Sequence, residues 1–410
     1  MSGVGVSGVL ANVVGQPSAV RGLTAAALAA ADIAAGRTPT SGAMTHAWLF
    51  TGPPGSGRSV AAQAFAAALQ CSERDSAAYA GVPGCGECAG CRTVLAGTHA
   101  DVRMVVPEGL SISVAEMRSL VQLAARRPST GAWQVVIVTD ADRLTEGASN
   151  ALLKAVEEPP ERTVFLLCAP SDHPDDVSVT IRSRCRVISL RTPAPAAIAE
   201  VLRTRDGVEP DMARWAGSVC GGHVGRARRL ATDPAARERR DGVLRIPLGL
   251  RRPSDVFACA DGLVSAAESE ASTVSEARDD AERDALHTAM GGDGTGKGVA
   301  AANRAANAAV KQLERRQKSR ATRTQRDSLD LALVDLAGFY RDVLVTSTGG
   351  TEATLSHPDR ARDVITAAAS WSPESTLLRL EAVLSCREAL EQNVKPRIAI
   401  EAMLCTLHAP

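Results

Sequence analysis

The sequence predicts an α/β domain with a parallel sheet, followed by an all-α region. Between residues 45 and 190, short apolar runs alternate with segments of helical spacing, which is the pattern of a parallel sheet of about five strands joined by helices. After residues 192–195 the strand-like runs cease, and the remaining sequence reads as helix. At 410 residues the chain is too long for one compact domain, so two or three are expected.

The elements of the sheet domain follow from short apolar runs and helix signals. Strands are expected at residues 45–51, 101–106, 134–140, 163–169 and 186–190, and helices within 13–36 and at 59–69, 113–127 and 150–157. The run at 134–140, QVVIVTD, is continuous and apolar, as expected of a strand covered on both faces. Ser113 and Glu116 have the spacing of a capping box, which predicts the start of a helix that stops before Pro128.

Three domains are expected in all. The sheet domain covers residues 1–192, a small helical lid domain 193–234 and a larger helical domain 235–410. Within the last, residues 268–326 form a segment with an acidic first arm, a glycine-rich tip and a basic second arm. We interpret this segment as a protruding helical hairpin whose arms offset each other's charge, because charge runs are usually solvated faces. A basic helix that contacts DNA is the alternative.

Composition limits the class of protein. The formal net charge is zero and the charged fraction is 22%, so no whole-chain basic field indicates nucleic-acid binding. The sequence has no run of eighteen apolar residues, and its first twenty residues lack the basic segment of a signal peptide, so we expect a soluble, cytoplasmic protein. Ten cysteines in such a chain indicate metal ligands or free buried thiols more than disulfides.

The segment WLFTGPPGSGRS, residues 48–59, is an apolar strand that turns through a glycine-rich loop into a helix. Its spacing is that of a P-loop, G-x-x-x-x-G-K-[ST], in which backbone N–H groups and a helix N-terminus face a phosphate. Arg58 stands where the pattern has lysine, and its broad, planar guanidinium does not reproduce a compact ammonium between two phosphates. We therefore predict a degenerate nucleotide site. Its residues would be Gly52, Gly55, Gly57, Arg58, Ser59 and Asp140.

Residues 135–142 resemble a Walker B strand. Asp140 occupies the position that helps to hold magnesium, and Ala141 stands where the catalytic glutamate of a hydrolase would activate water. Alanine has no proton acceptor, so Ala141 together with Arg58 predicts that the chain does not turn over ATP. Asp142 is displaced along the chain, and its simpler interpretation is a cap of the next helix.

Four cysteines predict a structural zinc site. Cys85, Cys88 and Cys91 form C-x2-C-x2-C, and Cys71 lies fourteen positions before the first of them. Four thiolates suit a tetrahedral zinc ion, and the flanking glycines let the backbone turn around it. Free thiols in a loop are the alternative, which three cysteines within seven residues disfavour. A site with four cysteine ligands has no open position for water, so its role would be structural.

Two arginines are candidates for contact with nucleotide. Arg184, in Ser183-Arg184-Cys185, follows the fourth strand, the place from which oligomeric ATPases project an arginine towards a neighbour's γ-phosphate. Arg226, in GGHVGRAR, lies in the small helical domain, where a second nucleotide sensor would be. An ordinary surface residue is an equally good interpretation of Arg226.

Together and in this order, these segments resemble the clamp-loader branch of the AAA+ ATPases, and within it the delta-prime family. The stretches that carry the resemblance are VVGQ (13–16), WLFTGPPGSGRS (48–59), Cys71 with CGECAGC (85–91), VVIVTDADRLTEGASNALLKAVEEPPERTVFLL (135–167) and TIRSRC (180–185). The run NALLKAVEEPPERTVFLL is the most specific of them. The resemblance is close over residues 10–230 and architectural beyond.

The resemblance implies a stationary, essentially non-hydrolysing subunit of a bacterial DNA polymerase III holoenzyme. Arg184 would act in trans as an arginine finger that completes the ATP site of a neighbouring motor subunit. The C-terminal helices would join a pentameric collar with motor subunits of the gamma/tau type and a delta subunit. The assembly would load a sliding clamp on primed DNA. Structural Zn²⁺ is implied, whereas binding of ATP and Mg²⁺ is left open.

Two other functions are alternatives. An active motor ATPase of the same complex predicts lysine and glutamate where Arg58 and Ala141 stand, and a long C-terminal extension. A P-loop kinase acting on a small molecule predicts a substrate lid with clustered catalytic aspartate and arginine and no collar. The helical C-terminal half disfavours the kinase.

Overall fold

The computed structural model describes residues 8–39, 41–73, 82–107, 109–289, 299–350 and 355–409. The chain divides into two compact units: the first holds residues 1–107 and 111–231, and the second holds residues 108–110 and 232–410. The first unit holds most of the predicted sheet domain (1–192) and lid domain (193–234), and their separation into two domains stays a prediction. None of the described helices combines the length and apolar character needed to span a bilayer.

The first unit is built on a five-stranded parallel sheet in the order β2-β3-β4-β1-β5. Its strands are β1 (Ala47–Thr51), β2 (Val102–Val105), β3 (Gln134–Val138), β4 (Thr163–Ala169) and β5 (Arg186–Ser189). Every residue of the three central strands is buried, as expected of a parallel sheet with helices on both faces. The predicted α/β fold is confirmed.

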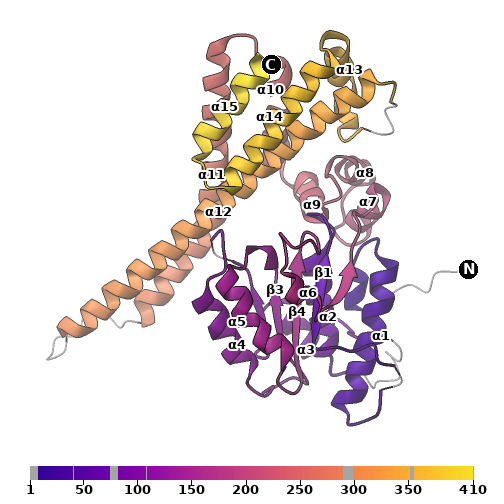
Figure 1. Cartoon of the computed structure of the whole chain (residues 1–410), viewed down its shortest axis with the longest axis vertical. Helices are drawn as coiled ribbons and strands as arrows, with labels where there is room; N and C mark the ends of the chain where they lie inside the picture. Colours follow the sequence, from indigo (N-terminus) through magenta and orange to yellow (C-terminus); the bar gives the residue numbers. More distant parts are fainter. Residues whose placement is uncertain are drawn as a thin grey trace, which may run out of the picture. The chain divides into compact units, whose positions relative to one another are not determined.

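Helices cover both faces of this sheet (Figure 1). The helices of residues 8–232 are α1 (Pro17–Ala34), α2 (Arg58–Leu69), α3 (Ala89–Leu95), α4 (Val114–Ala124), α5 (Glu146–Glu157), α6 (Val179–Arg182), α7 (Pro195–Thr204), α8 (Pro210–Val219) and α9 (Val224–Thr232), with short 3-10 turns at Val9–Asn12 and Ala141–Arg143. Side chains alternate along β1: Trp48 joins the core formed with α1 and α2, whereas Leu49 joins the core formed with α4 and α5. Trp48 meets Phe65 of α2 edge to face, with 5.1 Å between ring centroids.

Two helix starts show how local chemistry sets the elements. Ser113 Oγ accepts a hydrogen bond from Glu116 N at 3.2 Å, which confirms the predicted start of α4. The interpretation of Asp142 as a helix cap is wrong, because Asp142 lies inside the 3-10 turn and Thr145 caps α5 by accepting from Ala148 N. α5 therefore begins at Glu146, four residues earlier than predicted.

The regular elements described in the second unit are all helices, which confirms the predicted all-α region. Its helices are α10 (Pro234–Gly249), α11 (Pro253–Ala289), α12 (Val299–Ser347), α13 (Ala361–Ser370), α14 (Pro373–Glu391) and α15 (Pro396–His408), with a 3-10 turn at Pro358–Arg360. Its core is centred on the apolar stripe of α12, where Leu336, Phe339 and Tyr340 are fully buried against α14 and its neighbours.

The long helices α11 and α12 run side by side as a hairpin that extends from this core (Figure 1). Arg320 of α12 pairs with Asp279 of α11 at 2.7 Å and with Glu282 at 2.5 Å, and Gln317 Nε2 donates to the carbonyl of Asp279 at 3.0 Å. The arms therefore do offset each other's charge at these contacts. The predicted tip, residues 291–298, lies outside the described residues, and DNA contact by the hairpin stays untested.

A buried polar cluster joins α10 to α12 within the second unit. Arg240 is 5% exposed and donates to both carboxylate oxygens of Asp359, at 2.6 and 3.0 Å. Its Nη2 also lies 3.0 Å from His357 Nδ1, while His357 Nε2 lies 3.0 Å from the carbonyl of Asp335. Because a carbonyl only accepts, Nε2 carries the proton and Nδ1 accepts from Arg240. His357 is therefore neutral, in agreement with the burial that lowers its pKa.

Candidate functional site

The P-loop lies at the carboxyl edge of the sheet, between β1 and α2. Gly57 is the residue before α2 and adopts a left-handed conformation, with φ 91°, which favours glycine. Gly55 also has a positive φ, and a Cβ there would lie 2.6 Å from the Cα of His223. The segment before α9 therefore approaches the loop so closely that only glycine fits at position 55.

Two polar groups of the loop are buried without a hydrogen-bond partner among the described residues. Ser56 is 1% exposed, and its Oγ makes no hydrogen bond there; the same holds for Nη1 of Arg58. Buried donors of this kind are rare unless something else satisfies them. They lie beside the N-terminus of α2, where backbone N–H groups and the helix dipole favour an anion. This environment fits a bound phosphate.

The Walker B residues meet the P-loop at this edge. Burial raises the pKa of Asp142, the charge of Asp140 raises it further, and Arg58 acts in the opposite direction, so these charges lie close together. Burial also raises the pKa of Cys168, in β4, to about 12. Ser59 is exposed at the start of α2, and Asp140 accepts from Thr139 Oγ1 at 3.1 Å.

Position 141 offers nothing to activate water. The Ala141 side chain is buried, at 3% exposure, and packs into the core of α4 and α5. A general base must carry a proton acceptor within reach of the nucleophile. The neighbouring Asp142 follows in the 3-10 turn, where burial raises the pKa of its carboxyl group. The geometry therefore agrees with the sequence in placing no glutamate-like base at this strand end.

Arg184 lies on the surface, just after the short helix α6. Its side chain is 36% exposed, and its Nη1 donates to the Thr180 carbonyl at 2.9 Å and to Ser183 Oγ at 3.3 Å. Its Nη2 pairs with Glu157 Oε1 at 2.7 Å. Among the contacts described, none joins Arg184 to the P-loop of its own chain. Cys185 beside it is largely buried, which raises the pKa of its thiol to about 12.

Arg226 lies in the first turn of α9. Its backbone N–H donates to His223 Nδ1 at 3.2 Å, and its charge is one of the causes that lower the pKa of His223, after burial. His223 is the residue that approaches Gly55 of the P-loop. The structure thus brings Arg226 to the neighbourhood of the loop, while a role for it in sensing nucleotide stays a prediction.

Sequence reasoning gave no role to Gln16, the last residue of VVGQ. Gln16 is 6% exposed, its Nε2 donates to the carbonyl of Arg191 and its Oε1 accepts from Arg191 N at 3.1 Å. It therefore ties the chain before α1 to the segment after β5. Two further neighbours of the site were also missed, His223 and Glu157. Only the short VVGQ motif gave any signal in the sequence, because the other contacts depend on tertiary packing.

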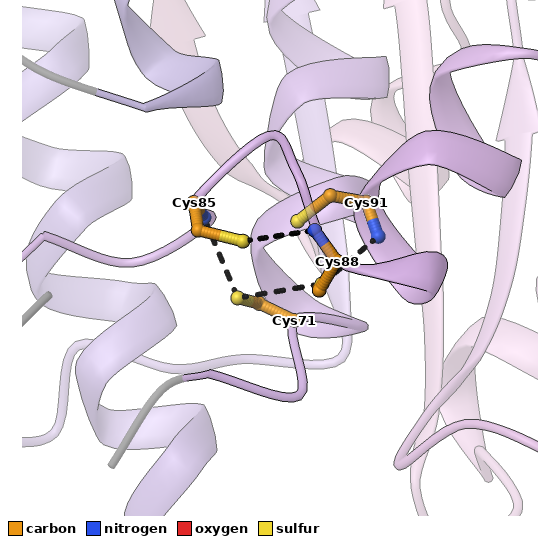
Figure 2. A group of neighbouring side chains, drawn as sticks. All are labelled: Cys71, Cys85, Cys88 and Cys91. Atoms are coloured by element: carbon orange, nitrogen blue, oxygen red, sulfur yellow. Dashed lines mark hydrogen bonds between the residues drawn. The ribbon is translucent and has the colours of Figure 1, made fainter. Parts of the chain in front are cut away.

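The four predicted cysteines come together at the end of α2 (Figure 2). Cys71 follows α2, Cys85 and Cys88 lie on the approach to α3, and Cys91 lies within α3. Their sulfur atoms all lie within 4.8 Å of one another, with 3.9 Å between those of Cys71 and Cys88. A zinc ion with bonds of about 2.3 Å to sulfur sets the edge of its tetrahedron at about 3.8 Å, so the donor set fits this ion.

Backbone N–H groups point at three of these sulfurs. Cys85 N donates to Cys71 Sγ at 3.4 Å, Cys88 N to Cys85 Sγ at 3.3 Å and Cys91 N to Cys88 Sγ at 3.4 Å. Such donors favour the thiolate form that a metal requires. Nearby, Gln63 of α2 donates to the carbonyls of Val94 and Leu95 and so holds the end of α3. The cluster therefore joins α2, which starts at the P-loop, to α3.

Comparison with known proteins finds similarity over part of the first unit. Residues 36–194 match the family described as DNA polymerase III, delta subunit. The chain is 31% identical to the DNA polymerase III subunit delta' of Bacillus subtilis over 203 residues, 50% of this chain and 59% of that protein. It is 39% identical to the delta' subunit of Pseudomonas aeruginosa over 158 residues, 38% of this chain and 45% of that protein.

A relative with another name matches nearly as well. The DNA polymerase III subunit tau of Bacillus subtilis is 37% identical over 142 residues, 35% of this chain and 24% of that protein. The chain thus spans about half the length of the two delta' relatives and about a quarter of the tau subunit. The matched segment contains the P-loop, the four cysteines and Arg184. Residues 36–194 are thus similar to the family described as DNA polymerase III, delta subunit, and the relatives matched include proteins named delta'.

Proposed function

We propose that the chain acts as the delta-prime subunit of a bacterial DNA polymerase III clamp loader. In this role it is a stator: it does not hydrolyse ATP at its own P-loop, and it donates Arg184 to the ATP site of a neighbouring motor subunit. The complex would then load a sliding clamp on primed DNA during replication. The chain is thus a component of the holoenzyme and has no turnover of its own.

The position of Arg184 carries this proposal. The guanidinium is exposed and is held by α5 and α6, away from the P-loop contacts of its own chain. An arginine in this place can contact a nucleotide only if that nucleotide is bound by a second protein. Its planar fork matches two oxygens of a γ-phosphate, on which charge builds during transfer. The buried Ala141 meanwhile leaves this chain's own site without a base.

The degenerate P-loop keeps part of its chemistry. Ser56 Oγ and Arg58 Nη1, which have no hydrogen-bond partner among the described residues, fit an anionic phosphate. Ser59 and Asp140 remain as candidate ligands of Mg²⁺. When bound, Mg²⁺ would neutralise phosphate charge. Gly52, Gly55 and Gly57 shape the loop in this proposal. Nucleotide could therefore bind there without being hydrolysed.

The cysteine cluster is proposed as a structural zinc site. Cys71, Cys85, Cys88 and Cys91 would each supply one sulfur and leave no position for water. When bound, the ion would link the end of α2 to α3. Its contribution would therefore be to the stability of the first unit and not to a chemical step.

Partners follow from the family. We propose a heteropentamer in which the chain joins gamma/tau-type motor subunits and a delta subunit, in the cytoplasm, with the helices of the second unit in a shared collar. The sliding clamp and primed DNA would be contacted through this assembly. An active motor subunit is the second candidate, favoured by the 37% identity to a tau subunit. Lysine and glutamate in place of Arg58 and Ala141 would be needed for that role, and neither is present.

The test is hydrolysis at the neighbour's site in a reconstituted complex, with the remaining motor sites inactivated so that the rate reports one site. Arg184→Ala should lower this rate by about 10³- to 10⁵-fold, as loss of an arginine finger does. Arg184→Lys should restore little, since an ammonium lacks the fork. Arg182→Ala is the matched control, because Arg182 ends α6 two residues before Arg184, is 49% exposed and pairs with Asp172. A normal rate in a fully assembled Arg184→Ala complex would refute the proposal.

A further inference from the structure

Glu157 is the last residue of α5, and its carboxylate meets the guanidinium of Arg184. Glu157 Oε1 lies 2.7 Å from Nη2, while Nη1 is engaged by the Thr180 carbonyl at 2.9 Å and by Ser183 Oγ at 3.3 Å. Both terminal nitrogens of Arg184 are thus held, from two different elements. The side chain is exposed but has a defined direction.

Fold stability does not account for Glu157 at this place. A carboxylate at the C-terminus of a helix faces the negative end of the helix dipole, which is unfavourable. The pair is also solvated, with the side chains of Arg184 and Glu157 36% and 41% exposed, and such pairs stabilise a fold little. What the pair does fix is the direction of a long, flexible arginine side chain.

The support beneath Glu157 is rigid. His46, just before β1, has its Nε2 2.8 Å from the carbonyl of Val156, and since a carbonyl only accepts, His46 donates this hydrogen bond. Val156 itself is fully buried in the core shared by α4 and α5. The end of α5 is therefore tied to the start of β1, and the carboxylate is presented from a fixed point.

We propose that Glu157 is a positioning residue for Arg184, which holds the guanidinium ready for the γ-phosphate of the neighbouring subunit. This inference rests on the trans role of Arg184 proposed above. Orienting the side chain beforehand reduces the cost of ordering it when the two subunits meet the nucleotide. Because the pair is solvated and weak, a phosphate with more negative charge can take over Nη2 without a large opposing cost. Thr180 and Ser183 keep Nη1 in place during this exchange.

The test uses the reconstituted complex, again with the remaining motor sites inactivated. Glu157→Gln keeps the length of the side chain and removes its charge. We expect kcat at the neighbour's site to fall about fivefold, which corresponds to the upper end of the range for a solvated ion pair, with the KM for ATP nearly unchanged. The kcat of Glu157→Asp should lie between those of wild type and Glu157→Gln. Glu158→Gln is the matched control, because Glu158 is exposed directly beside it.

A double variant separates positioning from any independent role. If Glu157 acts only through Arg184, Arg184→Ala with Glu157→Gln should hydrolyse ATP at the same rate as Arg184→Ala alone. Unchanged thermal unfolding and assembly of Glu157→Gln confirm that the fold is intact. A wild-type or raised rate in Glu157→Gln, beside a defective Arg184→Ala, overturns the inference and leaves the proposed function standing. A double variant slower than Arg184→Ala also overturns it, whereas a normal rate in Arg184→Ala removes the proposed function itself.

Discussion

Asp101 is the residue whose substitution tests most sharply how the first unit is held together. Its carboxylate is 3% exposed and accepts hydrogen bonds from the turn at residues 129–131. The backbone N–H groups of Ser129, Thr130 and Gly131 lie 2.7, 2.8 and 2.6 Å from it, and two hydroxyl groups of the same turn add further bonds. The turn leads into β3, so the carboxylate fixes the entry to this strand.

Asp101→Asn keeps the shape of the side chain and turns one acceptor oxygen into a donor. Oδ1 accepts from Ser129 N, and Oδ2 accepts from Thr130 N and Gly131 N, so either orientation of the amide sets its NH₂ against a backbone donor. A buried donor that loses its acceptor costs about 1–3 kcal/mol. With one or two donors affected, we expect the free energy of unfolding of the first unit to fall by about 2–4 kcal/mol.

The pKa of Asp101 predicts how the stabilisation by its carboxylate changes with pH. Burial acts to raise the pKa of Asp101, but the hydrogen bonds from Ser129, Gly131 and Thr130 outweigh it and hold this pKa well below its usual range. The stabilisation is therefore complete above the unfolded-state pKa of about 3.9 and is lost as the pH falls towards the lower folded value. The difference in unfolding free energy between wild type and Asp101→Asn should stay constant from about pH 5 to 8 and shrink below about pH 4.

Urea denaturation followed by tryptophan fluorescence measures this difference, since Trp133 lies two residues beyond the turn. Asp175→Asn is the matched control, because the Asp175 side chain is 91% exposed. Equal losses in the two variants would refute the reasoning about the buried carboxylate. A difference that does not narrow at acid pH would refute its link to the lowered pKa.

Three further predictions concern the metal, turnover and the second unit. Protein purified without chelator should hold about one zinc ion per chain. Cys71→Ser should lose this zinc, whereas Cys405→Ser, at an exposed cysteine, is the control and should keep it. Zinc in both variants, or in neither, would contradict the four-ligand site. The isolated chain should show negligible ATP hydrolysis because position 141 has no acceptor, and turnover at the rate of a motor subunit would contradict this. Arg240→Met should lower the unfolding free energy of the second unit by about 3–5 kcal/mol, because it leaves Asp359 without its buried partner; a loss below about 1 kcal/mol in denaturation would contradict this.

Elements with a local chemical signal were predictable. The continuous apolar run before Asp140 became β3, fully buried, because a strand covered on both faces needs no polar alternation. The four cysteines were predictable too, since thiolate chemistry defines a site whatever the path of the chain between Cys71 and Cys85. Helices α14 and α15 begin with proline in the first turn, as expected where a missing N–H costs nothing.

The features that the sequence did not predict are contacts made by tertiary packing and the exact residue at which a helix begins. The sequence indicated only Asp142 as a cap of the next helix, whereas Thr145 caps α5 by accepting from an N–H group of its first turn, and Asp142 lies in the preceding 3-10 turn. Glu157 and Arg184 are separated by β4 and α6, so no local pattern joins them. The close approach of His223 to Gly55 likewise arises only when α9 is placed by the fold.

The P-loop site and Arg184 are held in place by different helices and strands. The effects of substitutions at the two places on hydrolysis are therefore expected to be independent. Arg58 and Ala141 belong to the P-loop helix and to the end of β3, whereas Arg184 is held by α6 and by Glu157 at the end of α5. Substitutions that abolish hydrolysis within the chain therefore leave the contacts that position Arg184 intact. A subunit can lose its own turnover in this way and still serve a neighbour. We accordingly expect Arg58→Ala to leave hydrolysis at the neighbour's site unchanged, and a fall comparable to that of Arg184→Ala would show that the two halves are coupled.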